Sequence, residues 1–110
     1  MKVLIDECVP WKLGRHFAGH ECTSVVEAGF SGKKNGLLLI LAAQAGFDVL
    51  VTVDQGIPYQ QNLDDLPIAL MIIEARSNKM EDLLPQAPAC LLALEVIVPG
   101  DVVRVASPND

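Results

Sequence analysis

Two short apolar segments of this chain each end on a carboxylate. Val3–Ile5 is followed by Asp6 and Glu7, and Val49–Val53 is followed by Asp54. Continuous apolar runs of this kind are typical of strands that are buried on both faces of a parallel sheet. The carboxyl ends of parallel strands meet at one edge, where open α/β sheets bind their ligands. We therefore expect Asp6 and Asp54 to converge on one site.

Carboxylates that converge at a sheet edge need a positive partner. At about 4 Å and an effective dielectric constant near 20, two bare carboxylates repel by about 4 kcal/mol, which a metal, a proton or a basic side chain must offset. Magnesium needs only one or two carboxylates besides water and substrate phosphates, and it can activate water and neutralise phosphate charge. The pattern predicts a Mg²⁺ or Mn²⁺ site for phosphodiester cleavage, with Asp6 and Asp54 as catalytic residues and metal ligands and Glu7 as a further ligand. The alternative is that these acids only cap the turns that follow them.

A polar block follows Asp54 closely and supplies candidate substrate-binding residues, namely Tyr59, Gln60, Gln61 and Asn62. Amide side chains can hold a phosphate, a water or a base, and a tyrosine ring can stack on a base. An ordinary exposed loop is the alternative. Thr52 and Ser77 are expected to end strands at the same edge, where their hydroxyls could bond to the site.

Charge is distributed unevenly along the chain. The net charge of −6 argues against a protein whose whole surface is basic and binds nucleic acid. Residues 1–36 nevertheless carry five basic and four acidic side chains, whereas the remainder carries three basic and ten acidic ones. Lys12, Lys33 and Lys34 could thus form a basic rim near the predicted site, the alternative being a solvated surface.

Several classes of protein are disfavoured by the sequence. No charge-free apolar run reaches about 18 residues and no signal-peptide pattern opens the chain, so we expect a cytoplasmic protein without a membrane partner. The three cysteines, an odd number, are expected to be reduced, and Cys8 could face the site or be a small buried residue. The chain contains no G-x-G-x-x-G, phosphate-binding P-loop or G-x-S-x-G motif.

Strand-like and helix-like segments alternate along the chain. Strands are expected at about 2–5, 21–26, 48–53, 68–74 and 101–105. Helices are expected at about 11–18, where Trp11, Leu13 and Phe17 form an apolar face, and at 36–45 after an Asn35 N-cap. A further helix is expected at about 79–94, where Pro85 and Pro88 either break it or make it start late, near Pro88. This alternation predicts an α/β fold, with a mostly parallel sheet of about five strands flanked by helices. We expect one domain over residues 1–106 and a flexible tail over 107–110.

The chain resembles the small PIN-like proteins of an uncharacterised bacterial family related to the toxin nucleases of toxin–antitoxin systems. The resemblance covers nearly the whole chain and rests on Leu4–Glu7, Gly19–Glu21, Phe47–Asp54, Lys34–Gly36, Tyr59–Leu63 and Pro99–Val103. It implies a PIN-like (Rossmann-like) three-layer sandwich, a magnesium or manganese site of clustered acids, and ribonuclease activity.

The family pattern is only partly present. Asp6 and Asp54 match family acids, but the acid usual at the start of the second helix is missing from residues 34–38. The acid usual just after the third-strand aspartate is also missing, because Gln55 stands there. Asn35 could offer a carbonyl oxygen instead, although without a charge it would hold a metal less tightly.

Three functions compete at this point. The first is a metal-dependent ribonuclease toxin that acts on RNA, binds a small antitoxin protein, and uses Asn35, Lys33 and Lys34 for substrate binding. The second is a PIN-like binding or regulatory module that has lost catalysis. The third is a receiver domain with Asp54 as phospho-acceptor, although no lysine follows the fifth strand as that chemistry requires. A homodimer is expected in any case, because sheet edges and apolar helix faces pair readily.

Overall fold

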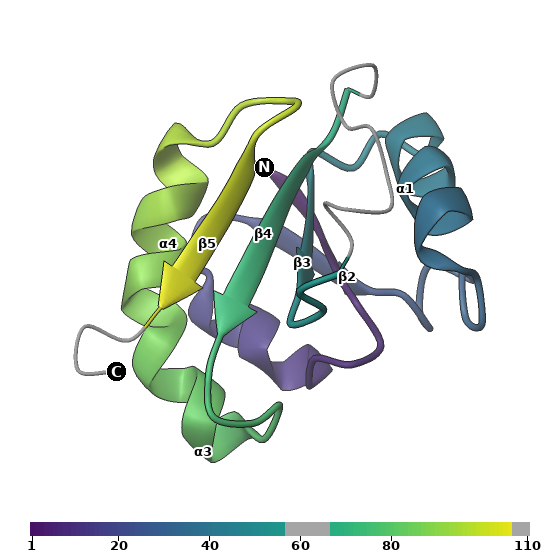
Figure 1. Cartoon of the computed structure of the whole chain (residues 1–110). Coiled ribbons are helices and arrows are strands. Elements are labelled where there is room, and N and C mark those ends of the chain that lie inside the picture. The colour runs from purple at the N-terminus through teal and green to yellow at the C-terminus, as the bar shows by residue number, and fades with distance from the viewer. Residues whose placement is uncertain (57–66, 107–110) are drawn as a thin grey trace.

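The computed structural model describes residues 1–56 and 67–106, apart from the side chain of Asn35. Five parallel strands form one sheet in the order β2-β1-β3-β4-β5 (Figure 1). The strands are β1 (Lys2–Ile5), β2 (Glu21–Ser24), β3 (Val49–Thr52), β4 (Ala69–Glu74) and β5 (Val102–Ala106). The predicted α/β fold with a central parallel sheet is confirmed.

The strand order places the predicted acids on neighbouring strands. β1 pairs with β2 on one side and with β3 on the other, so the order of the strands reverses between β1 and β3. A doubly wound sheet binds its ligand at such a switch point, outside the carboxyl ends of the strands. Ile5 lies opposite Val51 in the β1–β3 ladder, so the two strands end almost level.

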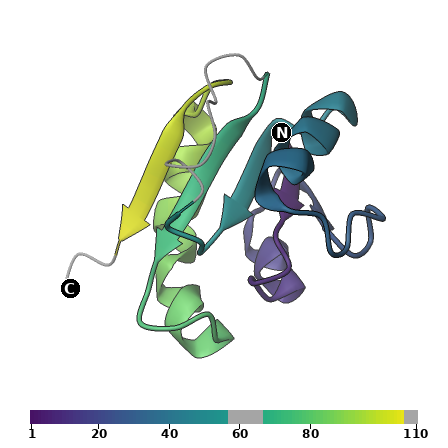
Figure 2. The same ribbon diagram turned by 45° about the vertical axis from the view of Figure 1, so that its right-hand side comes forward.

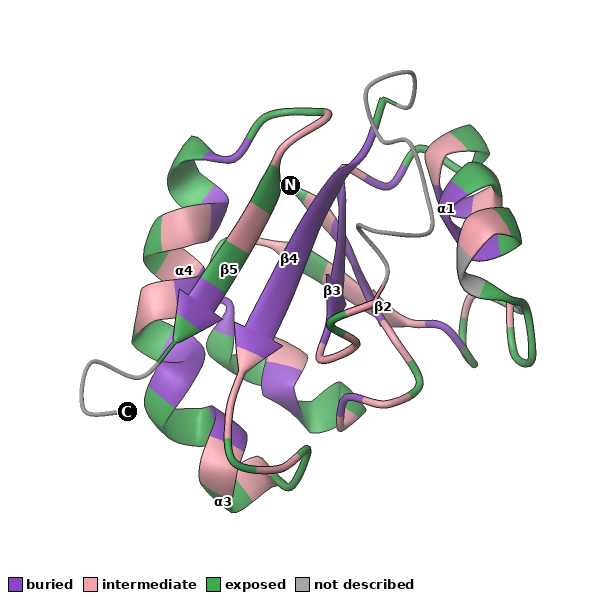
Figure 3. Ribbon diagram, viewed as in Figure 1, coloured by how far each residue is buried: buried purple, intermediate pink, exposed green. Residues whose placement is uncertain are grey.

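Helices cover both faces of the sheet and complete three layers (Figures 1 and 2). The helix α1 (Asn35–Gln44) covers one face, where Leu38 and Leu39 pack with Leu4 and Leu50. The other face is covered by η1 (Trp11–His16), α3 (Met80–Leu83), η2 (Leu84–Gln86) and α4 (Ala87–Val96). Successive strand residues point to opposite faces, so β3 and β4 are buried almost throughout (Figure 3).

Three local predictions need correction. The segment after β1 forms a short 3₁₀-helix over Trp11–His16, and its Trp11 is exposed, whereas Leu13 is buried as expected. Asn35 is the first residue of α1, and Lys34 holds the N-cap position instead. The strand β2 ends at Ser24, because the carbonyl of Ser24 accepts a turn hydrogen bond from the Ala28 N–H (2.9 Å).

Of the two alternatives predicted for the C-terminal helix, the structure shows the broken one. Its first turn α3 ends at Leu83, η2 follows with Pro85 in its first turn, and α4 begins with Pro88 in its first turn. Proline has no N–H to donate, so it is tolerated in a first turn and interrupts a longer helix. Within the described residues, no helix has the length and apolar character needed to cross a membrane.

Candidate functional site

The site begins with Asp6, the residue that follows β1. Its backbone N–H donates to the carbonyl of Val51 (3.0 Å), which extends the β1–β3 ladder by one bond. Its carboxylate Oδ2 accepts a hydrogen bond from the hydroxyl of Thr52 (2.8 Å), and its Oδ1 accepts one from the Glu7 N–H (2.8 Å). The Asp6 side chain is therefore held against the end of β3.

Thr52, the last residue of β3, connects the two aspartates. Its side chain is fully buried, and its Oγ1 accepts a hydrogen bond from the Asp54 N–H (3.1 Å) while donating to Asp6. Asp54 then turns back on its own loop, since its Oδ1 accepts from the Gly56 N–H (2.8 Å), as in an Asx-turn. Asp6 and Asp54 thus lie at the same edge of the sheet, and one hydroxyl bonds both to the carboxylate of Asp6 and to the backbone N–H of Asp54.

Cys8 lies beside this bridge. Its Sγ is 3.5 Å from Thr52 Oγ1 and 3.6 Å from Asp6 Oδ2. Burial raises the pKa of the Cys8 thiol above its usual value, and the charge on Asp6 raises it further, although the hydrogen bond between Cys8 and Thr52 acts in the opposite direction. Cys8 is therefore a neutral thiol near pH 7 and can donate its S–H to the Asp6 carboxylate.

Glu7 points to another part of the site. Its Oε1 accepts a hydrogen bond from the Gly32 N–H (2.8 Å), in the turn that precedes α1. Lys33 and Lys34 follow directly in that turn, and both are exposed. Glu7 consequently fixes the turn that presents the two lysines, a contact across 25 residues that the sequence pattern did not indicate.

The remaining predicted residues are placed differently. Ser77 donates its hydroxyl to Asp82 and accepts from the Lys79 N–H (3.0 Å), so it serves the start of α3 and does not bond to the Asp6–Thr52 bridge. The candidates Tyr59, Gln60, Gln61 and Asn62 lie outside the described residues, as does the side chain of Asn35.

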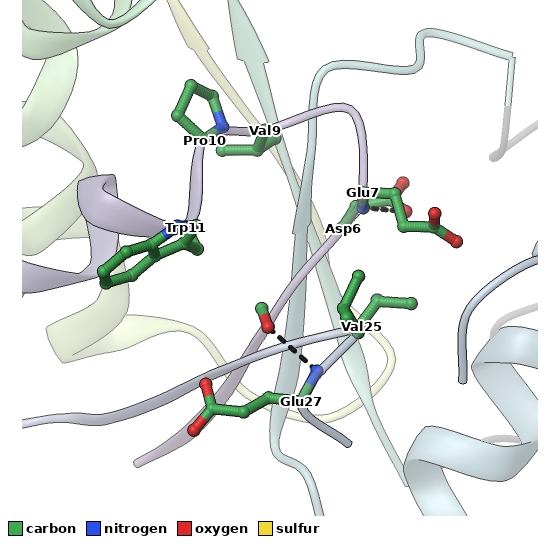
Figure 4. A pocket seen from close by; sticks show the side chains of 9 residues that line it. Asp6, Glu7, Val9, Pro10, Trp11, Val25 and Glu27 are labelled. Atoms are coloured by element: carbon green, nitrogen blue, oxygen red, sulfur yellow. Dashed lines mark hydrogen bonds between the residues drawn. The ribbon is translucent and has the colours of Figure 1, made fainter. Parts of the chain in front are cut away.

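A pocket of about 610 Å³ opens beside Asp6, between the carboxyl ends of β1 and β2 (Figure 4). Asp6 and Glu7 stand at one end of it, and Pro10 and Trp11 stand at the other. Its full lining is Asp6, Glu7, Val9, Pro10, Trp11, Ser24, Val25, Val26 and Glu27. The sequence pattern did not indicate this pocket, although a tryptophan so soon after the first acidic strand end was a usable signal.

A second hollow lies at the carboxyl ends of β3, β4 and β5. It measures about 510 Å³ and is lined by Gln55, Glu74, Ala75, Arg76 and Ala106. Beside it, the Arg104 guanidinium donates to Gln55 (2.8 Å) and forms an ion pair with Glu74 (3.6 Å). The Asp6–Thr52 bridge and Asp54 therefore stand between two hollows at the same edge of the sheet.

The acids of the site offer oxygen ligands of the kind that a divalent metal such as Mg²⁺ prefers. Asp6 Oδ1 accepts one hydrogen bond within the described part of the chain, and a carboxylate oxygen has a second lone pair for a cation. No group of three or more His, Cys, Asp and Glu side chains that could hold a metal occurs in residues 1–56 and 67–106. Magnesium accepts as few as one or two carboxylates, so Asp6 with Asp54 at the same edge of the sheet would be sufficient in number.

Comparison with known proteins gave no match: the sequence matched no family model and no curated protein, and the structure matched no solved structure.

Proposed function

We propose that this protein is a metal-dependent endoribonuclease of the PIN-like type, acting as the toxin of a toxin–antitoxin pair. The observation that carries the proposal is the Thr52 hydroxyl, which donates to Asp6 and accepts from the Asp54 N–H at the ends of neighbouring parallel strands. This is the edge at which a doubly wound sheet binds ligands. The resemblance of the sequence to PIN-like proteins supports the same reading.

Mg²⁺ or Mn²⁺ would be held by Asp6 and Asp54, with Glu7 close by in sequence. Such an ion supplies an activated water and neutralises charge on the phosphate when it is bound. Thr52 holds the carboxylate of Asp6 in place, which limits the side-chain entropy lost when a ligand is bound. Lys33 and Lys34, presented by the turn that Glu7 fixes, attract the RNA backbone.

A second candidate function is a PIN-like module that binds RNA or a small antitoxin protein without cleaving it. The specific observation in its favour is that no group of three or more His, Cys, Asp and Glu side chains that could hold a metal is found in residues 1–56 and 67–106. At the start of α1, Lys34, Asn35 and Gly36 stand where the family usually has an acid. A receiver domain shares the strand order 2-1-3-4-5, but the chain after β5 lacks the lysine that its chemistry needs.

The first experiment is calorimetric titration of the protein with Mg²⁺ and Mn²⁺. Wild-type protein should bind either ion, and Asp6→Asn together with Asp54→Asn should abolish binding. Glu95→Gln, which removes an exposed carboxylate on α4, is the matched control and should bind as the wild type does. Absence of binding at millimolar metal would contradict the metal site.

Cleavage of single-stranded RNA by highly purified protein then separates the candidates. Activity that chelator abolishes and that Asp6→Asn lacks would support the ribonuclease. Metal binding without cleavage would favour the binding module instead. Covalent modification of Asp54 by a small phosphodonor would favour the receiver domain over both.

A further inference from the structure

Trp11 is placed unusually for the single tryptophan of a protein with a large apolar core. It is 54% exposed at the start of η1, in the wall of the 610 Å³ pocket, whereas Leu13 and Phe17 of the same segment are buried. A tryptophan ring offers more area to a core than almost any other side chain. The Trp11 ring therefore contributes little to the hydrophobic core, and it is exposed to solvent in the wall of the pocket.

Two cations lie against the same ring. The Arg15 guanidinium carbon is 4.8 Å from the centroid of the Trp11 ring, and the Lys12 Nζ is 5.8 Å from it. Proteins that bind single-stranded nucleic acid combine an exposed aromatic ring, which stacks on a base, with cations that follow the backbone. Trp11, Lys12 and Arg15 supply both parts within the single short helix η1.

The opposite wall of the pocket offers acceptors. Asp6 and Glu7 lie at the end of the pocket opposite Trp11, and the Glu27 side chain extends toward the Trp11 side (Figure 4). Carboxylates repel a phosphate, but they accept hydrogen bonds from the exocyclic amine of a base, as Asp and Glu do with the cytosine N4 amine. The pocket lining is thus largely apolar, with carboxylates from Asp6 and Glu7 at one end and from Glu27 at the side, and cations lie only around the rim near Trp11.

We propose that this pocket is a subsite for one unpaired base of single-stranded RNA, stacked on Trp11, with a preference for bases that carry an exocyclic amine. Arg15 and Lys12 contact the adjoining phosphate, and the acidic end accepts the amine. The volume of about 610 Å³ lies in the range of ordinary small-molecule sites, roughly 300–1,000 Å³. Because Asp6 lines the same pocket, the bound base positions the next phosphate near the acids, where a metal held by Asp6 would offset their repulsion, and in this respect the inference rests on the proposed function.

Trp11 itself reports binding, since the chain has no other tryptophan. RNA oligonucleotides of equal length are titrated in the presence of EDTA, so that the signal does not depend on metal or cleavage. Oligocytidylate should quench Trp11 fluorescence strongly, oligouridylate should quench it more weakly, and a chain of abasic ribose phosphates should leave it unchanged.

Variants are then compared by the anisotropy of a labelled oligocytidylate. Trp11→Ala should weaken binding roughly tenfold, within the range found when stacked aromatic rings are removed, and Trp11→Phe should restore part of the loss. Arg15→Ala should weaken binding of all three oligonucleotides, whereas Lys79→Ala, which removes an exposed lysine before α3, should not. Circular dichroism confirms that each variant is folded.

The outcomes separate this inference from the proposed function. Labelled RNA that binds without any change in Trp11 emission, or equal quenching by the abasic chain, would overturn the subsite even if the protein cleaves RNA. Base-dependent quenching by a protein that neither binds metal nor cleaves RNA would retain the subsite and overturn the ribonuclease. Failure of any RNA to bind would overturn the subsite outright.

Discussion

The candidate site depends on Thr52 more than on any other single residue. Its hydroxyl is buried, donates a hydrogen bond to the Asp6 carboxylate and accepts one from the Asp54 N–H. The hydroxyl therefore has a partner both as a donor and as an acceptor. A threonine at the end of an apolar strand has no distinctive sequence signature. Asp6 and Asp54 were identified from their positions after the strands, whereas the residue that connects them was only one of several hydroxyls at the edge.

We predict that Thr52→Val will weaken metal binding about tenfold and lower the free energy of unfolding by about 1–3 kcal/mol, the range for a buried group left without its partner. Valine keeps the branched shape but cannot hydrogen-bond, which leaves the Asp54 N–H without this acceptor and Asp6 without this donor. Calorimetry and urea denaturation measure the two effects. Thr23→Val in β2 is the control, and equal effects from both substitutions would contradict the role of Thr52.

At the scale of elements, η1 lies very close to β2. A Cβ built on Gly14 would be only 2.8 Å from the Cβ of Cys22, closer than side chains tolerate. Gly14 is not among the glycines with a positive φ, so contact alone explains why a glycine is favoured there. This close approach seats η1 on the sheet and thereby positions Trp11 at the pocket.

We predict that Gly14→Ala will lower the free energy of unfolding by about 1–3 kcal/mol, as overpacking of a tight contact does. The midpoint of urea denaturation should fall, and RNA quenching of Trp11 should weaken because η1 is displaced. Lys12→Ala in the same helix is a surface change and should alter stability by no more than about 0.5 kcal/mol. Wild-type stability in Gly14→Ala would show that η1 can move away from β2 without cost.

Considered as a whole, the molecule leaves apolar helix surfaces uncovered. In α1, Leu37 and Ile40 are 48% and 43% exposed, and in α4, Leu92 and Val96 are 68% and 76% exposed. Both helices are apolar around most of their circumference, a pattern usual for helices that are buried on all sides. The α4 surface is the more exposed, and β5, at the edge of the sheet, lies next to it (Figure 1).

We predict that the protein forms a homodimer through the α4 surface and that Leu92→Glu together with Val96→Glu will shift it towards monomer. Introducing two charges into a buried apolar interface costs far more than the same charges at an exposed surface. Sedimentation velocity over a range of concentrations measures the shift. Leu37→Glu together with Ile40→Glu on α1 is the matched control, and a wild-type protein that stays monomeric throughout would refute the prediction.

The sequence by itself determined the class of fold and the positions of the acids along the chain. Apolar runs of strand length, separated by helical segments, are typical of a parallel sheet covered on both faces, so the alternation and the acids at strand ends could be predicted directly. Tertiary structure decided which strand ends are neighbours and which side chains meet there. The bond between Thr52 and Asp6 spans 46 residues, and the bond between Gly32 and Glu7 spans 25. Such contacts depend on strand order and register, which local pattern does not encode; for the same reason only the folded chain shows that Trp11 faces a pocket and not the core.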